Sequence, residues 1–417
     1  MKTPKPIFQL VVFFLVVGFR VYNAQGNALK LEEVRQEVME RNPSIQAAKA
    51  RADARKYSAK IERSLPAPEF SYERWGLGGG KIAEESWYGI RQKIPFPSKL
   101  SRKAQSMEHE ANAQGYHAQG TERELLSQAE KAYFDLFYYS RALPNVEENA
   151  ILFRQFIRSG AAKYATSEIA QVDLVRAQTE LTKLLNLKIT LEQEKASIDL
   201  ELKTLMNRVF DVPLGTPEAP TMRELPNVDA LEHWALSNRP EVRAAEHHIE
   251  HLRANRAVAK LEYVPDFEVR YAYRTRPLLD NDSMVMVGIE LPFFWLNRPR
   301  AVNRMAEAEL KEAQANFSSL QLETRAAIHR AWTGADTARR SAQLIETTLL
   351  PQARQTQKIM VKAYATRQVT FLDLVDAERT RLDAELEWAS QLRNFGQRIA
   401  DLERLLGNSL SEVSYEK

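Results

Sequence analysis

The chain has 417 residues, with 58 Lys and Arg against 55 Asp and Glu, and it contains no cysteine. The lack of cysteine excludes disulfide frameworks, thiolate metal sites and cysteine nucleophiles. The basic excess lies in residues 1–26, which contain Lys2, Lys5 and Arg20 and no acid. The remainder is neutral and has no basic footprint for nucleic acid, so no nucleic-acid partner is expected.

Residues 1–26 have the pattern of a secretory signal peptide. Lys2 and Lys5 precede a mostly apolar run over residues 7–19, and small residues follow at positions 24 and 26. The alternative is a membrane anchor, but a spanning helix needs roughly 20 apolar residues and this run is shorter. The pattern therefore predicts an exported chain.

Two halves of the sequence resemble each other. Residues 40–48 recur at 237–245, and residues 164–177 recur at 364–377 with the same residue at the matching Tyr, Ala, Thr, Asp, Leu, Val and Ala positions. A spacing near 200 residues is too long for a solenoid and indicates an internal duplication. We expect a first repeat at 27–210, a proline-rich linker at 211–226, a second repeat at 227–410 and a tail at 411–417.

Each repeat has the pattern of a helix, two strands and long helices. The predicted elements are strands at about 69–76 and 86–94 with long helices at about 98–160 and 170–208, then strands at about 266–276 and 283–291 with long helices at about 298–362 and 371–407. Leu184, Leu191, Ile198 and Leu205 follow at intervals of seven. This favours coiled-coil packing, with an ordinary bundle helix as the alternative.

The predicted strands alternate between apolar and polar residues. One face of the second pair carries Phe267, Val269, Tyr271, Tyr273, Val285, Val287 and Ile289, and the other carries charges such as Arg270 and Arg274. Alternation fits either a soluble α+β domain or a membrane barrel; together with the signal peptide, the aromatic faces favour the barrel. Four strands cannot close a barrel, because the smallest have about eight, so several chains must each contribute four.

The motifs resemble those of the outer-membrane efflux proteins, the TolC-like family, with the heavy-metal branch as the best match. The resemblance rests on Arg41-Asn42-Pro43 and its copy at 238–240, on residues 66–70 and 93–100, and on residues 364–377. It implies a mainly α fold with a membrane β-barrel: a homotrimer with a 12-stranded barrel and a periplasmic α-helical tunnel. It also implies outer-membrane lipid, a periplasmic membrane-fusion adaptor and a proton-driven inner-membrane pump as partners.

The resemblance also implies roles for residues near the two helical turns. Asp373 and Asp376 would line the periplasmic entrance, where three copies form a carboxylate ring that favours cations; the alternative is ordinary surface acids. The residues expected at the periplasmic tip and adaptor contact are Tyr164, Thr166, Ser167, Asp173, Tyr364, Thr366, Arg367 and Thr370. Ser167 and Arg367 replace the glycine usual in these turns.

No cluster typical of an enzyme is present, and no cofactor is expected. His247, His248 and His251 share a predicted helix, where a solvated face is the preferred interpretation and a metal site the third hypothesis. His109-Glu110 begins a zincin-like pattern that fails at Ala113. The sequence therefore predicts a passive outer-membrane exit channel of a tripartite efflux system, for metal cations or small toxic compounds. The alternatives are a periplasmic coiled-coil adaptor without a barrel and an outer-membrane duct for protein secretion.

Overall fold

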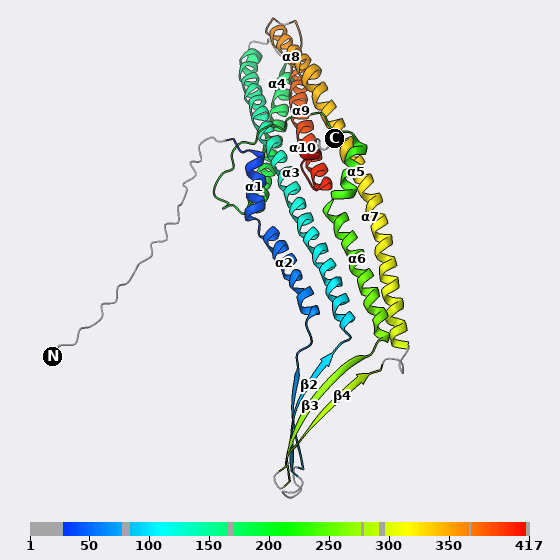
Figure 1. Ribbon diagram of the computed structural model, residues 1–417. Helices are drawn as coiled ribbons and strands as arrows, with labels where there is room; N and C mark the ends of the chain where they lie inside the picture. Colours follow the sequence, from blue (N-terminus) through cyan, green and yellow to red (C-terminus); the bar gives the residue numbers. More distant parts are fainter. Residues whose placement is uncertain are drawn as a thin grey trace, which may run out of the picture.

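The computed structural model describes residues 28–76, 84–165, 170–276, 279–291, 297–366 and 368–413. The molecule is an elongated helical bundle that carries a β-sheet at one end and two helical hairpin tips at the other (Figure 1). The predicted signal peptide at residues 1–26 lies outside the described residues. Within the described ranges, no helix combines the length and the apolar character needed to cross a membrane.

The first half contains two short helices, a hairpin and two long helices. These are α1 (Leu31–Arg41), α2 (Pro43–Arg63), β1 (Glu69–Trp75), β2 (Glu85–Ile94), α3 (Pro97–Ala165) and α4 (Gln171–Leu205). Helix α3 has 69 residues and continues through Pro144. At 1.5 Å per residue it is about 100 Å long, so it spans from the sheet to the tip.

The second half repeats this order. Its elements are α5 (Val228–Asn238), α6 (Pro240–Lys260), η1 (Leu261–Tyr263), β3 (Asp266–Thr275), β4 (Asp282–Glu290), α7 (Asn297–Leu344), η3 (Ile345–Leu349), α8 (Leu350–Ala365), α9 (Phe371–Leu406) and α10 (Leu410–Val413). The predicted fold class, two repeats of a β-hairpin and long helices, is confirmed. The helix expected at 298–362 is divided by η3, a π-helical turn just before Pro351, which has no N–H to continue the ladder.

The duplicated motif at residues 41–43 and 238–240 marks a helix start in each half. Pro43 and Pro240 are the first residues of α2 and α6, where a missing N–H costs nothing. The Asn42 side chain accepts hydrogen bonds from the backbone N–H groups of Ser44 and Ile45, and its amide donates to the carbonyl of Leu205 at 2.9 Å. Asn42 therefore caps α2 and ties it to the end of α4.

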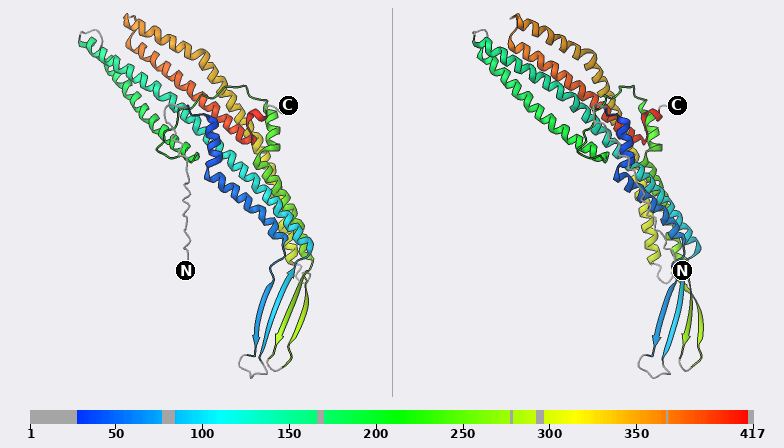
Figure 2. Two further views of the ribbon diagram at one scale, coloured as in Figure 1. Left: turned by 60° about the vertical axis from the view of Figure 1, so that its left-hand side comes forward. Right: turned by 90° about the vertical axis from the view of Figure 1, so that its left-hand side faces the viewer.

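The segment between the repeats lies along the middle of the bundle (Figure 2). Leu29 forms a bridge with Pro217, and the Tyr133 hydroxyl on α3 donates to the carbonyl of Leu29 at 2.9 Å. The same hydroxyl accepts a hydrogen bond from the N–H of Glu218 at 2.8 Å. Tyr133 thus fastens both the start of the described chain and the linker to α3. Burial raises the pKa of this hydroxyl to about 12, so it stays protonated at neutral pH.

Candidate functional site

The four strands form one antiparallel sheet in the order β1-β2-β3-β4, with a continuous apolar face. Phe70, Ile90, Tyr271 and Val285 stand directly opposite one another across all four strands. The neighbouring rows on this face contain Tyr72, Tyr88 and Tyr273 on one side and Val269 and Val287 on the other. The predicted set on β3 and β4 therefore shares one face. Val285 and Val287 are 68% and 67% exposed, so none of the described residues covers this face.

The opposite face of the sheet is held by ion pairs between strands. Arg270 on β3 lies 3.2 Å from Glu73 on β1, and Arg91 on β2 lies 3.7 Å from Glu268 on β3. Arg274 also pairs with Asp282 across the β3–β4 hairpin. The sheet thus carries paired charges on one face and an uncovered apolar surface on the other. This pattern is typical of strands that separate lipid from a polar lumen.

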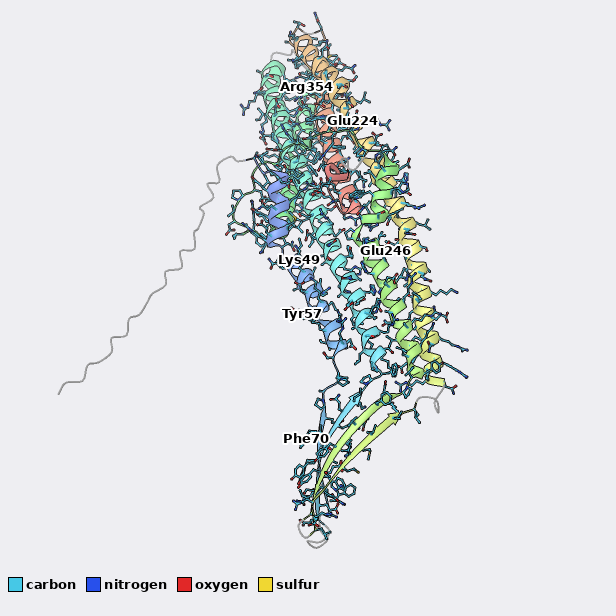
Figure 3. All side chains as sticks on the ribbon, in the orientation of Figure 1. Lys49, Tyr57, Phe70, Glu224, Glu246 and Arg354 are labelled. Carbon is cyan, nitrogen blue, oxygen red and sulfur yellow. The ribbon has the colours of Figure 1, made fainter. Side chains whose placement is uncertain are left out.

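Both outer edges of the molecule lack a neighbour among the described residues. Strands β1 and β4 each pair on one side only, and the helices joined to them, α2 and α7, lie at the same two edges. The uncovered side of α2 carries Tyr57 and Ile61, of which Ile61 is 70% exposed, and the exposed Leu65 follows just after the end of the helix. Figure 3 shows Tyr57 on α2 and Phe70 on β1 along this edge. An edge with apolar side chains and open backbone groups requires a partner.

The two helical hairpins meet at the other end of the molecule. The Phe371 ring at the start of α9 lies 6.2 Å from the Phe156 ring on α3 and 5.9 Å from the Tyr364 ring on α8. Partial burial raises the pKa of the Tyr364 hydroxyl, and the nearby charge of Asp173 adds to this shift. The structure therefore brings together Tyr364 and Asp173, which were predicted from the two halves. Of the other predicted tip residues, Tyr164, Thr366 and Thr370 are described, whereas Thr166, Ser167 and Arg367 lie outside the described residues.

Asp373 and Asp376 lie exposed in the first turns of α9. The Asp373 carboxylate accepts hydrogen bonds from the backbone N–H of Thr370 at 2.9 Å and from its hydroxyl at 2.7 Å. With the return bond from the Asp373 N–H to the Thr370 hydroxyl, this is a capping box, and these hydrogen bonds lower the pKa of Asp373. Asp373 therefore stabilises the start of α9, and its carboxylate is also exposed to solvent. The role of Asp373 and Asp376 at the channel entrance stays a prediction.

A buried cluster of three charged side chains joins α1, α3 and α9 at mid-height. The Arg35 guanidinium lies 2.6 Å from Glu130 and 2.5 Å from Glu403. Arg35 and Glu130 also line a cavity of about 190 Å³ beneath the linker, together with Tyr133 and Phe395. The cluster was not predicted from the sequence, because Arg35 is 95 residues from Glu130 and 368 from Glu403. The only signal was a charged residue, Glu130, within the apolar stretch of α3.

Glu130 predicts a pH dependence of stability. Burial is the largest cause that raises its pKa, to about 7; Arg35 opposes this shift and Glu403 adds to it. Because the folded state binds the proton more tightly than the unfolded state, this contribution to stability is present below about pH 4.5 and is lost as pH rises through about 7. We expect the difference in unfolding midpoint between Glu130→Gln and wild type to shift in favour of the variant as pH rises from 5 to 8, because only the wild type has a carboxylate to ionise at this position. Unfolding midpoints in detergent measure this, and parallel pH profiles would contradict it.

The three neighbouring histidines do not form the solvated face that was preferred from the sequence. His248 is exposed, but His247 and His251 are half-buried where α6 packs against α3. His251 Nδ1 lies 2.9 Å from the Ser106 hydroxyl, and its Nε2 lies 3.0 Å from the Asn255 amide. The i,i+4 spacing of His247 and His251 therefore reflects helix packing. Across the described residues, no group of three His, Cys, Asp or Glu side chains is arranged to hold a metal ion.

A long helical bundle with a two-faced sheet at one end and open edges on both sides is the arrangement that an outer-membrane duct built from several chains requires. The chain is similar to the solved outer-membrane channel OprN, with a TM-score of 0.78 and 18% identity over 91% of this chain and 90% of the other. It is also similar to the open state of the Neisseria gonorrhoeae MtrE outer membrane channel, with a TM-score of 0.78 and 19% identity over 91% of this chain and 89% of the other. At these identities the likeness establishes the fold.

The sequence comparisons extend this likeness to a family. Residues 231–408 match the model of the family described as outer membrane efflux protein. The cobalt-zinc-cadmium resistance protein CzcC of Cupriavidus metallidurans is 22% identical over 295 residues, which are 69% of each chain. The match to this family covers residues 231–408 in the second half of the chain, and the likeness in fold to the solved channels extends through the first half.

Proposed function

We propose that the chain is the passive outer-membrane exit channel of a tripartite efflux system. The observation that carries the proposal is the sheet, which has an uncovered apolar face, an ion-paired face and two open edges. The helices beneath it are long enough to continue a channel for about 100 Å. The adaptor alternative is not favoured, because a periplasmic protein would expose this apolar face to water.

Closure of the barrel requires several copies, and the two edges of the chain suit a ring. One edge carries α2 and β1, and the other carries β4 and α7, so each copy would meet the next through two different surfaces. Such a head-to-tail interface forms a cyclic assembly when the rotation between copies closes, and a closed barrel requires that closure. Three copies would provide 12 strands, above the minimum of about eight. The homotrimer is therefore part of the proposal.

Ile61→Asp is expected to disrupt this assembly. The substitution would bury a carboxylate at the proposed α2–α7 contact, where an unpaired charge costs several kcal/mol. We expect the fraction of trimer in detergent to fall at least tenfold, measured by light scattering after size exclusion. Arg55→Asp, at an exposed position on another side of α2, is the matched control. A trimer that tolerates Ile61→Asp as well as Arg55→Asp would argue against this interface.

The proposed cargo is metal cations or small toxic compounds delivered by a periplasmic adaptor and an inner-membrane pump. CzcC is named as a cobalt-zinc-cadmium resistance protein, which supports metal cations as the cargo.

In the proposed trimer, the three copies of Asp376 would form a ring at the entrance and favour cations. We expect Asp376→Ala to lower the cation preference of the channel in planar bilayers, whereas Asp53→Ala on α2 should leave it unchanged. If both variants kept the ion selectivity of wild type, Asp376 would not line the entrance. If no variant and no wild-type protein conducted ions, the proposed exit channel would be contradicted.

A further inference from the structure

His109 on α3 and His247 on α6 place two imidazoles next to each other between these helices. The ring centroids of His109 and His247 are 6.1 Å apart, with the ring planes inclined by 31°. The Nδ1 atoms of both rings are buried and have no partner among the described residues. Tyr116 stacks on the His247 ring at 5.4 Å and holds it in place. Buried polar nitrogens normally have a partner, so this pair requires an explanation.

The neighbouring histidines do not share this feature. His251 uses both ring nitrogens in contacts with Ser106 and Asn255, and His248 faces Glu110, with Nδ1 3.9 Å from Oε2. The pair at His109 and His247 is therefore distinct from the i,i+4 pair suggested by the sequence.

The geometry points to a site for one divalent late transition-metal ion, and we propose that His109 and His247 bind it. Imidazole suits Zn²⁺, Ni²⁺ and Cu²⁺. With metal–nitrogen distances of about 2.0–2.1 Å, two imidazoles on one ion have centroids about 5–6 Å apart, depending on the angle. The observed 6.1 Å lies just above this range, so binding requires the rings to approach by less than about 1 Å.

Charges of both signs lie around the pair. Arg243 acts on His247 with positive charge, and Glu246 and Glu250 act on it with negative charge. Because only two side chains would bind the ion, water would complete its coordination. The inference does not rest on transport, since it concerns binding by the protein itself.

The test is equilibrium dialysis of the untagged protein in detergent against Zn²⁺ alone. We expect wild type to bind one more Zn²⁺ per chain than His109→Gln or His247→Gln, and His233→Gln, at an exposed position on α5, to bind like wild type. Each single variant should weaken this site at least tenfold, because one imidazole would remain. Equal binding by wild type and both variants would overturn the proposal, and so would loss only in His248→Gln or His251→Gln.

A second measurement does not depend on the folding of a variant. Diethyl pyrocarbonate modifies neutral imidazoles, and mass spectrometry identifies each modified residue. We expect Zn²⁺ to protect His109 and His247 at least fivefold, while the exposed His117 on α3 reacts equally with and without the ion. If Zn²⁺ left the modification of His109 and His247 unchanged, the proposed site would be overturned.

Discussion

Val287→Arg is expected to remove most of the protein from the outer membrane. Val287 lies in the middle of β4 on the apolar face, 67% exposed and in one row with Val269. An arginine on the lipid face of a barrel costs about 2–4 kcal/mol near the bilayer midplane. The trimer would carry this cost in each of its three copies, so we expect at least a tenfold loss of protein in the outer-membrane fraction.

The adjacent residue provides the matched control. Met286 is also exposed but points to the opposite face, in one row with Arg270 and Arg91. Met286→Arg adds the same charge one residue away, on the face proposed to line the lumen, and should leave insertion within about twofold of wild type. The measurement is immunodetection of the folded trimer in separated membranes. Equal insertion of the two variants would contradict the proposed orientation of the sheet, and soluble wild-type protein would contradict the barrel.

Much of the fold could be predicted because its determinants are local. Strand alternation with period two defines β3 and β4, and prolines such as Pro43 and Pro240 mark the helix starts. The division of the predicted helix at η3 was missed, because Pro351 at the start of a helix and Pro144 inside one look alike in the sequence. Pro144 lies within a continuous α3, whereas Pro351 follows a π turn. Tertiary packing decides between these outcomes.

The candidate site was predictable only in part. The apolar face followed from alternation, and the capping role of Asp373 could have been recognised, since Thr370 and Asp373 have the spacing of a capping box. The pairing of His109 with His247 could not, because it depends on how α3 and α6 align. The same holds for the Arg35 cluster, whose members are joined only by folding.

Arg35→Ala is expected to give the largest loss of stability in the helical part of the protein. The side chains of Glu130 and Glu403 are 6% and 9% exposed, and Arg35 is the cation that lies between them. Glu403 also accepts hydrogen bonds from the Ser409 hydroxyl and the Leu410 N–H, so its carboxylate is held in place near Glu130. Removing the cation leaves two buried carboxylates facing each other, and breaking a buried pair in this way costs about 3–5 kcal/mol.

The pH dependence of this loss separates it from simple loss of packing. We expect Arg35→Ala to lower the thermal unfolding midpoint in detergent most at pH 8, where Glu130 is charged, and less at pH 5, where Glu130 with its raised pKa binds a proton. Adding Glu130→Gln to Arg35→Ala should recover part of the loss, since one charge disappears. Arg354→Ala is the control: Arg354 also pairs with a buried carboxylate, Glu385, but its side chain is 57% exposed, and its removal should cost no more than about 1 kcal/mol. A loss for Arg35→Ala that is equal at pH 5 and pH 8, with no recovery in the double variant, would show that Arg35 acts through its packing and not its charge.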